Sequence, residues 1–295
     1  MGERLDMELA VESVVKTKKG GKRKILAVSL VILAIAGAVC IGWIFSQKHG
    51  PKGCWDYIVQ KEQYYVEYSE EYDYWDVLTI EYPVLNGIEE DVQEKINEQL
   101  YETAMDRVNY WHLHPDEKVK AFQKDQFSVF CSDVTADVTY HSQYLVSADF
   151  YEIYSAGHPL WNTNITERGL TADLMTGKVY RLTDILEINR DFVKLWDACS
   201  TRRTGEEGWD EESIELLHSW FLETDEELLY YESHPFFYLT EDKEFAIGLS
   251  LDAVLYAAIT YEPTSRILCT VMKPEELAPY RKESEFWDRY ENSQV

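Results

Sequence analysis

The chain has 295 residues, with 28 Lys and Arg against 54 Asp and Glu, which gives a net charge of −26. This acidity disfavours nucleic-acid binding, because the phosphate backbone would be repelled. Aromatic residues make up 14% of the chain, which excludes a disordered acidic tail and indicates a packed core.

The first element in chain order is an uncharged apolar run at residues 25–45. As a helix rising ~1.5 Å per residue it would span roughly 31 Å, about the thickness of a bilayer's hydrocarbon core. Six bases lie between Lys16 and Lys24, whereas Lys48 and Lys52 are the nearest that follow the run. The positive-inside rule therefore predicts a single-pass protein of the cell membrane, with a cytosolic tail at 1–24 and an extracellular part after residue 45.

Charge changes sign across this predicted span. Residues 1–24 hold seven bases and four acids, a net of +3. Removing these from the totals of 28 and 54 leaves 21 bases and 50 acids in residues 46–295, a net of −29. Such a surface favours a basic partner and speeds its association. The alternative is an acidic surface that keeps the protein soluble without preferring any partner.

The exterior part begins with a linker at 46–60, where glycine and proline interrupt any regular structure. Strands are then predicted at 64–68 and 77–81 from alternating apolar residues, and a helix at 88–111 from an apolar residue at every fourth position. Further strands are expected at 127–140, 144–154, 162–173, 179–180, 236–239, 244–251 and 266–272. Helices are expected to begin at 182, to cover 210–222 and to begin again at 273. This order predicts an α+β fold, with antiparallel sheets and packed helices.

Four cysteines lie in the exterior part, where disulfides can persist. They allow three pairings, and the sequence does not choose among them. Their spacing is not that of a zinc site, and we expect neither a metal nor a cofactor. The four are Cys54, Cys131, Cys199 and Cys269.

Two predicted loops combine turn residues with aromatic side chains, a composition found in protein-binding hot spots. We expect these loops to contact a protein partner. The alternative is that both are ordinary turns, with His158 bonded to a backbone carbonyl to fix the first. The candidate residues are Ser155, Gly157, His158, Pro159 and Trp161 in the first loop, and Tyr261, Glu262 and Pro263 in the second.

Three groups of segments occur in an order that resembles a known family. They are TIEYPVLNGI at 79–88; YSAGHP at 154–159 with GLTADLMTG at 169–177 and YRLTDIL at 180–186; and FYLTED at 237–242 with YAA at 256–258 and EEL at 275–277. Together they resemble the paired DUF4163 and DUF3298 domains of the RsiV-type anti-sigma factors. On this resemblance, 61–154 is the DUF4163-like subdomain, 155–282 the DUF3298-like subdomain and 283–295 a C-terminal tail.

The resemblance implies a membrane receptor rather than an enzyme. In that family a cytosolic segment holds an extracytoplasmic-function sigma factor, and the exterior module binds lysozyme, a basic protein. The expected partners are therefore the membrane, a basic ligand such as lysozyme and a sigma factor. The alternative is a non-signalling envelope or cell-wall-associated protein with no cytosolic partner.

Overall fold

The computed structural model describes residues 57–67, 77–126, 130–156, 163–205, 207–222, 233–251, 253–260 and 266–294. The predicted cytosolic tail, the span at 25–45 and the linker up to residue 56 lie outside these residues. Among the residues described, no helix is both long and apolar enough to cross a membrane.

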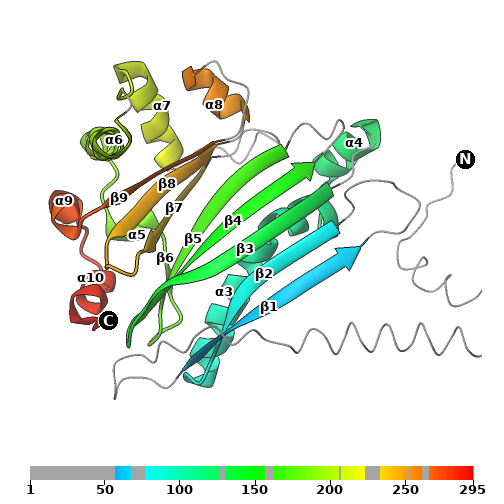
Figure 1. Cartoon of the computed structure of the whole chain (residues 1–295), viewed down its shortest axis with the longest axis horizontal. Helices are drawn as coiled ribbons and strands as arrows, with labels where there is room; N and C mark the ends of the chain where they lie inside the picture. The colour runs from blue at the N-terminus through cyan, green and yellow to red at the C-terminus, as the bar shows by residue number, and fades with distance from the viewer. Residues whose placement is uncertain are drawn as a thin grey trace, which may run out of the picture. The chain divides into compact units, whose positions relative to one another are not determined.

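Six strands form the larger sheet, in the order in which they follow one another along the chain. Neighbours pair antiparallel except for β2 and β3, which are parallel and are connected through a helix. Figure 1 shows these strands from light blue to green across the centre of the molecule. The strands are β1 (Ile58–Glu67), β2 (Val77–Asn86), β3 (Phe130–His141), β4 (Leu145–Ala156), β5 (Thr163–Asp173) and β6 (Val179–Tyr180).

Helix α3 (Glu90–Val108) packs against one face of this sheet and lies behind β2 and β3 in Figure 1. Its apolar residues recur at every fourth position, which places Val92, Ile96 and Leu100 in one buried row. Asn97 fixes the helix to β2, because its side chain accepts from the backbone N–H of Leu85 at 2.8 Å and donates to the Leu85 carbonyl at 2.9 Å. A first hydrophobic core fills the space between them.

The smaller sheet is antiparallel and consists of β7 (Ser233–Leu239), β8 (Phe245–Leu251) and β9 (Arg266–Met272). Its strands and the surrounding helices enclose a second hydrophobic core. The helices that contribute buried side chains to this core include α6 (Arg190–Thr204), α7 (Glu211–Phe221) and α10 (Glu285–Asn292). The remaining helical segments are η1 (Asn109–Leu113), α4 (Glu117–Gln126), α5 (Leu182–Ile185), α8 (Ala253–Thr260), α9 (Pro274–Leu277) and η2 (Ala278–Tyr280).

The predicted α+β class, with antiparallel sheets and packed helices, is confirmed. Three boundaries differ. Strand β1 begins at Ile58, inside the expected linker, and the expected subdomain boundary at residue 155 falls within β4. The segment expected as a tail contains α10, because Phe286, Trp287 and Tyr290 share one apolar face that packs into the second core.

The two sheets meet where β7 approaches β5. A methyl group added to Gly169 on β5 would lie 2.3 Å from the backbone oxygen of Phe237 on β7. Real Cβ atoms do not come this close to a backbone oxygen, so this junction requires glycine. In Figure 1 the yellow and orange strands of the smaller sheet accordingly lie directly beside green β5.

We expect Gly169→Ala to destabilise the protein by roughly 1–3 kcal/mol, because the added methyl group must push the two strands apart. Urea denaturation followed by tryptophan fluorescence measures the change. Thr135→Ala is the control, since Thr135 is exposed on β3 and its loss should change the free energy of unfolding by under ~0.5 kcal/mol. Equal effects of the two changes would contradict the close approach.

Candidate functional site

Most of the loop residues predicted to bind a partner lie outside the described residues. Ser155 is described, at the end of β4, where it is buried and its Oγ atom has no hydrogen-bond partner among the described groups. It therefore does not form part of an exposed loop surface. The predictions for Gly157, His158, Pro159, Trp161, Tyr261, Glu262 and Pro263 stay predictions.

The cysteines that the structure describes form no disulfide with one another. Cys131, Cys199 and Cys269 are free, and they lie on β3, α6 and β9 respectively. The Cys199 thiol instead accepts a hydrogen bond from Arg202 Nη2 at 2.8 Å, and burial raises its pKa. None of these three cysteines is therefore disulfide-bonded to another of the three. Cys54 lies outside the described residues.

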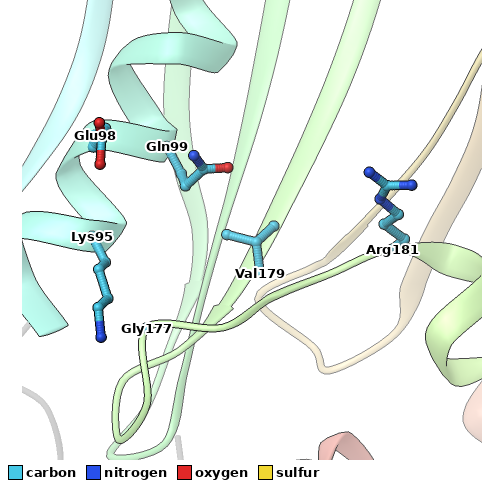
Figure 2. Close-up of a pocket in the computed structure, with 6 residues that line it drawn as sticks. All are labelled: Lys95, Glu98, Gln99, Gly177, Val179 and Arg181. Atoms are coloured by element: carbon cyan, nitrogen blue, oxygen red, sulfur yellow. The ribbon is translucent and has the colours of Figure 1, made fainter.

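Two surface hollows are candidate binding sites. One, of about 400 Å³, lies between α3 and the turn that leads into β6. Figure 2 shows Lys95, Glu98 and Gln99 on the helix side, with Arg181 well apart on the other side. The second, of about 520 Å³, lies beside Cys199 and mixes bases with acids. Neither brings like groups together around one point, so neither favours a particular ligand.

A buried ionic network joins α3 to the larger sheet. Arg168 on β5 pairs with Glu152 on β4 at 2.7 Å, and their side chains are only 9% and 0% exposed. Ser132 on β3 donates to the second oxygen of Glu152 at 2.5 Å, while Arg168 Nε donates to the Thr103 carbonyl of α3 at 3.1 Å. The guanidinium group of Arg168 therefore connects helix α3 with strands β4 and β5.

The same network continues towards the smaller sheet. Arg107 on α3 is buried, hydrogen-bonds His234 on β7 and pairs with Asp106 at 3.5 Å. Burial alone would raise the pKa of Asp106, but Arg107, Arg168 and His234 together hold it below its ordinary value. Arg168 thus neutralises the buried Glu152, and Arg107 pairs with Asp106, whose side chain is partly exposed at the edge of the network.

The opposite face of the larger sheet carries exposed side chains. On β3 the residues that alternate with the buried ones, Asp133, Thr135 and Asp137, are exposed. Their cross-strand partners on β4 are Ile153, Tyr151 and Asp149, which share the face because directly paired residues point the same way. We call this surface the open face, and it also includes Glu167 on β5, Thr79 and Glu81 on β2, and Lys61, Gln63 and Tyr65 on β1. Asp149 and Glu167 are half-buried, because β7 packs against the same face at Gly169.

The open face combines large apolar side chains with negative charge. Tyr65, Tyr151 and Ile153 are 49%, 38% and 42% exposed. Among the described side chains the face holds five carboxylates and one base, Lys61, which pairs with Glu81 at 3.1 Å and with Asp137 at 3.5 Å. Burial and the nearby Glu81 raise the pKa of Asp133. The carboxylates of this face therefore repel one another.

Asp149 and Glu167 hold the most perturbed carboxylates of the open face. They are diagonal neighbours in the β4–β5 register, and Tyr238 on β7 lies close to both. Burial, then Glu167, then Asp137 raise the pKa of Asp149 to about 8, and burial also raises the pKa of Glu167. This environment therefore favours the protonated form of both carboxyl groups.

The sequence patterns did not predict the pair of Asp149 and Glu167. The alternation of acids with apolar residues at 132–137 was a usable signal for an acidic sheet face, but the meeting of Asp149 with Glu167 depends on the register of β4 and β5. Among the described residues, no three His, Cys, Asp or Glu side chains are placed to hold a metal ion. The open face therefore combines negative charge with exposed apolar side chains.

We expect Arg168→Met to destabilise the protein by roughly 3–5 kcal/mol, because it leaves the charge of Glu152 buried without a partner. Arg190→Met is the matched control, since Arg190 pairs with Glu215 at 2.7 Å on the surface and should cost at most ~1 kcal/mol. Urea denaturation measures both. Similar costs for the two changes would show that the buried pair does not hold the layers together.

The raised pKa of Asp149 predicts how stability depends on pH. Between the unfolded value, roughly 4, and about 8, the folded state binds more protons than the unfolded one, so the free energy of unfolding falls as pH rises through this range. Asp149→Asn should remove this fall, so that its gain over the natural protein is larger at pH 8.5 than at pH 5.

Thermal or urea unfolding at the two pH values measures this difference. Asp210→Asn is a control of opposite sign, because hydrogen bonds from Ser213 at the start of α7 lower the pKa of Asp210. Its contribution to stability is present above the ordinary range and is lost as pH falls. A gain for Asp149→Asn that does not change with pH would contradict the raised pKa of Asp149.

Among solved structures, two DUF3298 family proteins are similar to this chain at low sequence identity. No protein-family model and no curated protein sequence matches it. A DUF3298 family member from Bacteroides fragilis is 10% identical, with a TM-score of 0.46, and the match covers 80% of this chain and 98% of that one. A DUF3298 family protein from Pseudomonas aeruginosa is 14% identical, with a TM-score of 0.42, and covers 76% of this chain and 94% of that one.

Proposed function

We propose that this chain is a single-pass membrane protein whose exterior α+β module binds a basic protein. On this proposal it is a receptor and not an enzyme, with residues 1–24 in the cytosol and 46–295 outside the cell. The ligand class includes lysozyme, and the cytosolic tail regulates an extracytoplasmic-function sigma factor.

The observation that carries the proposal is the open face. Protein-binding surfaces are rich in tyrosine and in exposed apolar area, and here Tyr65, Tyr151 and Ile153 supply both. The five carboxylates around them favour a basic partner, in agreement with the net charge of −29 carried by residues 46–295. Complementary charge of this kind steers association and selects partners more than it adds affinity.

The resemblance to the RsiV-type anti-sigma factors supports the signalling part of the proposal. The small net positive tail, the uncharged run and the large acidic part follow one another as in that family. A membrane receptor also accounts for the change from +3 to −29 across residues 25–45, since the bases hold the tail in the cytosol.

Lysozyme binding by the full chain in lipid nanodiscs tests the proposal. We expect binding at physiological salt that weakens as salt is raised, because exposed charges are screened beyond roughly 8 Å at 0.15 M. Deleting residues 1–15 should leave lysozyme binding intact and abolish control of the sigma factor in cells.

An absence of lysozyme binding even at low salt would overturn the lysozyme part. Unchanged sigma-factor activity after the deletion would overturn the signalling part and favour a non-signalling envelope protein. Isothermal titration calorimetry and a sigma-dependent reporter are the two measurements.

A further inference from the structure

We infer that strand β1 is a dimer interface, where it pairs antiparallel with β1 of a second copy of this chain about a two-fold axis at Gln63. The inference goes beyond the proposed function, because it concerns the edge of the larger sheet and assigns that edge to a different partner.

The first argument is that β1 is a long and regular edge strand. Among the described strands it pairs with β2 alone, and its ten residues from Ile58 to Glu67 pair without a register shift. In an antiparallel pair, every second residue directs its backbone N–H and C=O groups away from the neighbouring strand. Half of the residues of β1 therefore direct these groups outward, and Figure 1 shows β1 at the outer border of the sheet.

The other edges of the described sheets are short or lie against another element. Strand β6, at the far edge of the larger sheet, has only two residues. In the smaller sheet, β7 lies against β5 and β9 lies against α6. Strand β1 is thus the long edge that the described part of the chain leaves open to another strand.

Strand β1 also lacks the usual protection of an edge. Edge strands are commonly protected by proline, by a bulge or by charged side chains. There is no proline in β1, and its pairing with β2 has no bulge between Ile58 and Glu67. Its described charged side chains are bonded to neighbours on the sheet: Lys61 pairs with Glu81 at 3.1 Å, and the Tyr82 hydroxyl donates to Glu62 at 3.1 Å.

The second argument is that charge and length select one register of self-pairing. A two-fold axis that joins identical edges in antiparallel direction is perpendicular to the sheet, so one residue of β1 faces its own copy at the axis. With Lys61 or Glu62 at the axis, like charges would be directly opposite, which is destabilising. With Gln63 at the axis, residues 59–67 pair with 67–59 of the second copy, and axis positions nearer either end of β1 pair shorter segments.

The side chains that this register brings together complement one another. Gln63 faces its own copy, and two amide groups can hydrogen-bond each other. Lys61 faces Tyr65 of the second copy, which is 49% exposed, and a lysine stem can pack on such a ring. On the side of α3, Glu62 faces Tyr64 of the second copy, whose hydroxyl can donate to the carboxylate. Among the described side chains of β1, no like charges are directly opposite.

This pairing joins the two larger sheets edge to edge. The backbone hydrogen bonds at the edge supply affinity, and the cross-strand side chains set the register. Because the axis is perpendicular to the sheet, both open faces lie on the same side of the joined sheet. A dimer therefore presents the acidic and apolar side chains of the open face twice on one surface.

Sedimentation velocity of the full chain in detergent micelles tests the inference. We expect a concentration-dependent dimer of twice 34.6 kDa. Gln63 is exposed, so Gln63→Lys and Gln63→Glu should leave the single chain folded. Each should raise the dimer dissociation constant about fivefold, because like charges then face each other at the axis. An equimolar mixture of the two variants should restore the affinity, because opposite charges meet in the mixed dimer.

Thr135→Lys is the matched control, since it adds the same charge at an exposed position of β3, away from the edge, and should leave the dissociation constant unchanged. A chain that stays monomeric at its highest soluble concentration would overturn the inference. A dimer that Gln63→Lys leaves unchanged would also overturn it, because another surface would then hold the two copies together. The same conclusion would follow if mixing the two variants did not restore the dimer. Lysozyme is absent from these experiments, so each of these outcomes leaves the proposed function standing.

Discussion

The interaction on which the rest of the fold depends is the buried pair of Arg168 and Glu152. A charge this deep is tolerated only when it is paired, and further polar contacts around the pair add to its stability. Ser132, the Thr103 carbonyl and, at 3.9 Å, Asp106 supply these further contacts. Because the partners come from β3, β4, β5 and α3, the pair sets the position of the helix over the sheet as well as joining two strands.

Carboxyl groups lie on both faces of β4 and β5, and their surroundings differ between the two faces. Towards α3, a carboxylate is neutralised by a permanent cation, and the result is rigid and closed. Towards the open face, burial raises the pKa of both Asp149 and Glu167, and the closeness of the two carboxyls raises that of Asp149 further, so their protonated forms are favoured. Strand alternation places these two arrangements on opposite faces of the sheet, three residues apart along β4.

Local patterns predicted most of the elements. The apolar residues at every fourth position of 88–108 and the alternation along 130–140 were enough for α3 and β3. Helix α10 was missed although Ser284 caps it and Phe286 and Tyr290 follow at helical spacing, because eight residues give a short pattern. The candidate site was harder to predict, since it consists of residues brought together by register and by the packing of β7 on β5. Sequence spacing says little about such contacts.

Helix α10 affects the folding of the chain during synthesis as well as the stability of the folded protein. The second core draws side chains from Tyr140 to Tyr290, and Phe286 lies within it against Tyr180, Phe237 and Phe245. Synthesis proceeds from the N-terminus, so this core stays open until residues 285–292 have emerged. The smaller sheet then has apolar surface in contact with water throughout the earlier stages of translation. During that interval, chaperones or fast synthesis must keep this apolar surface from aggregating, because the native contacts that cover it have not yet formed.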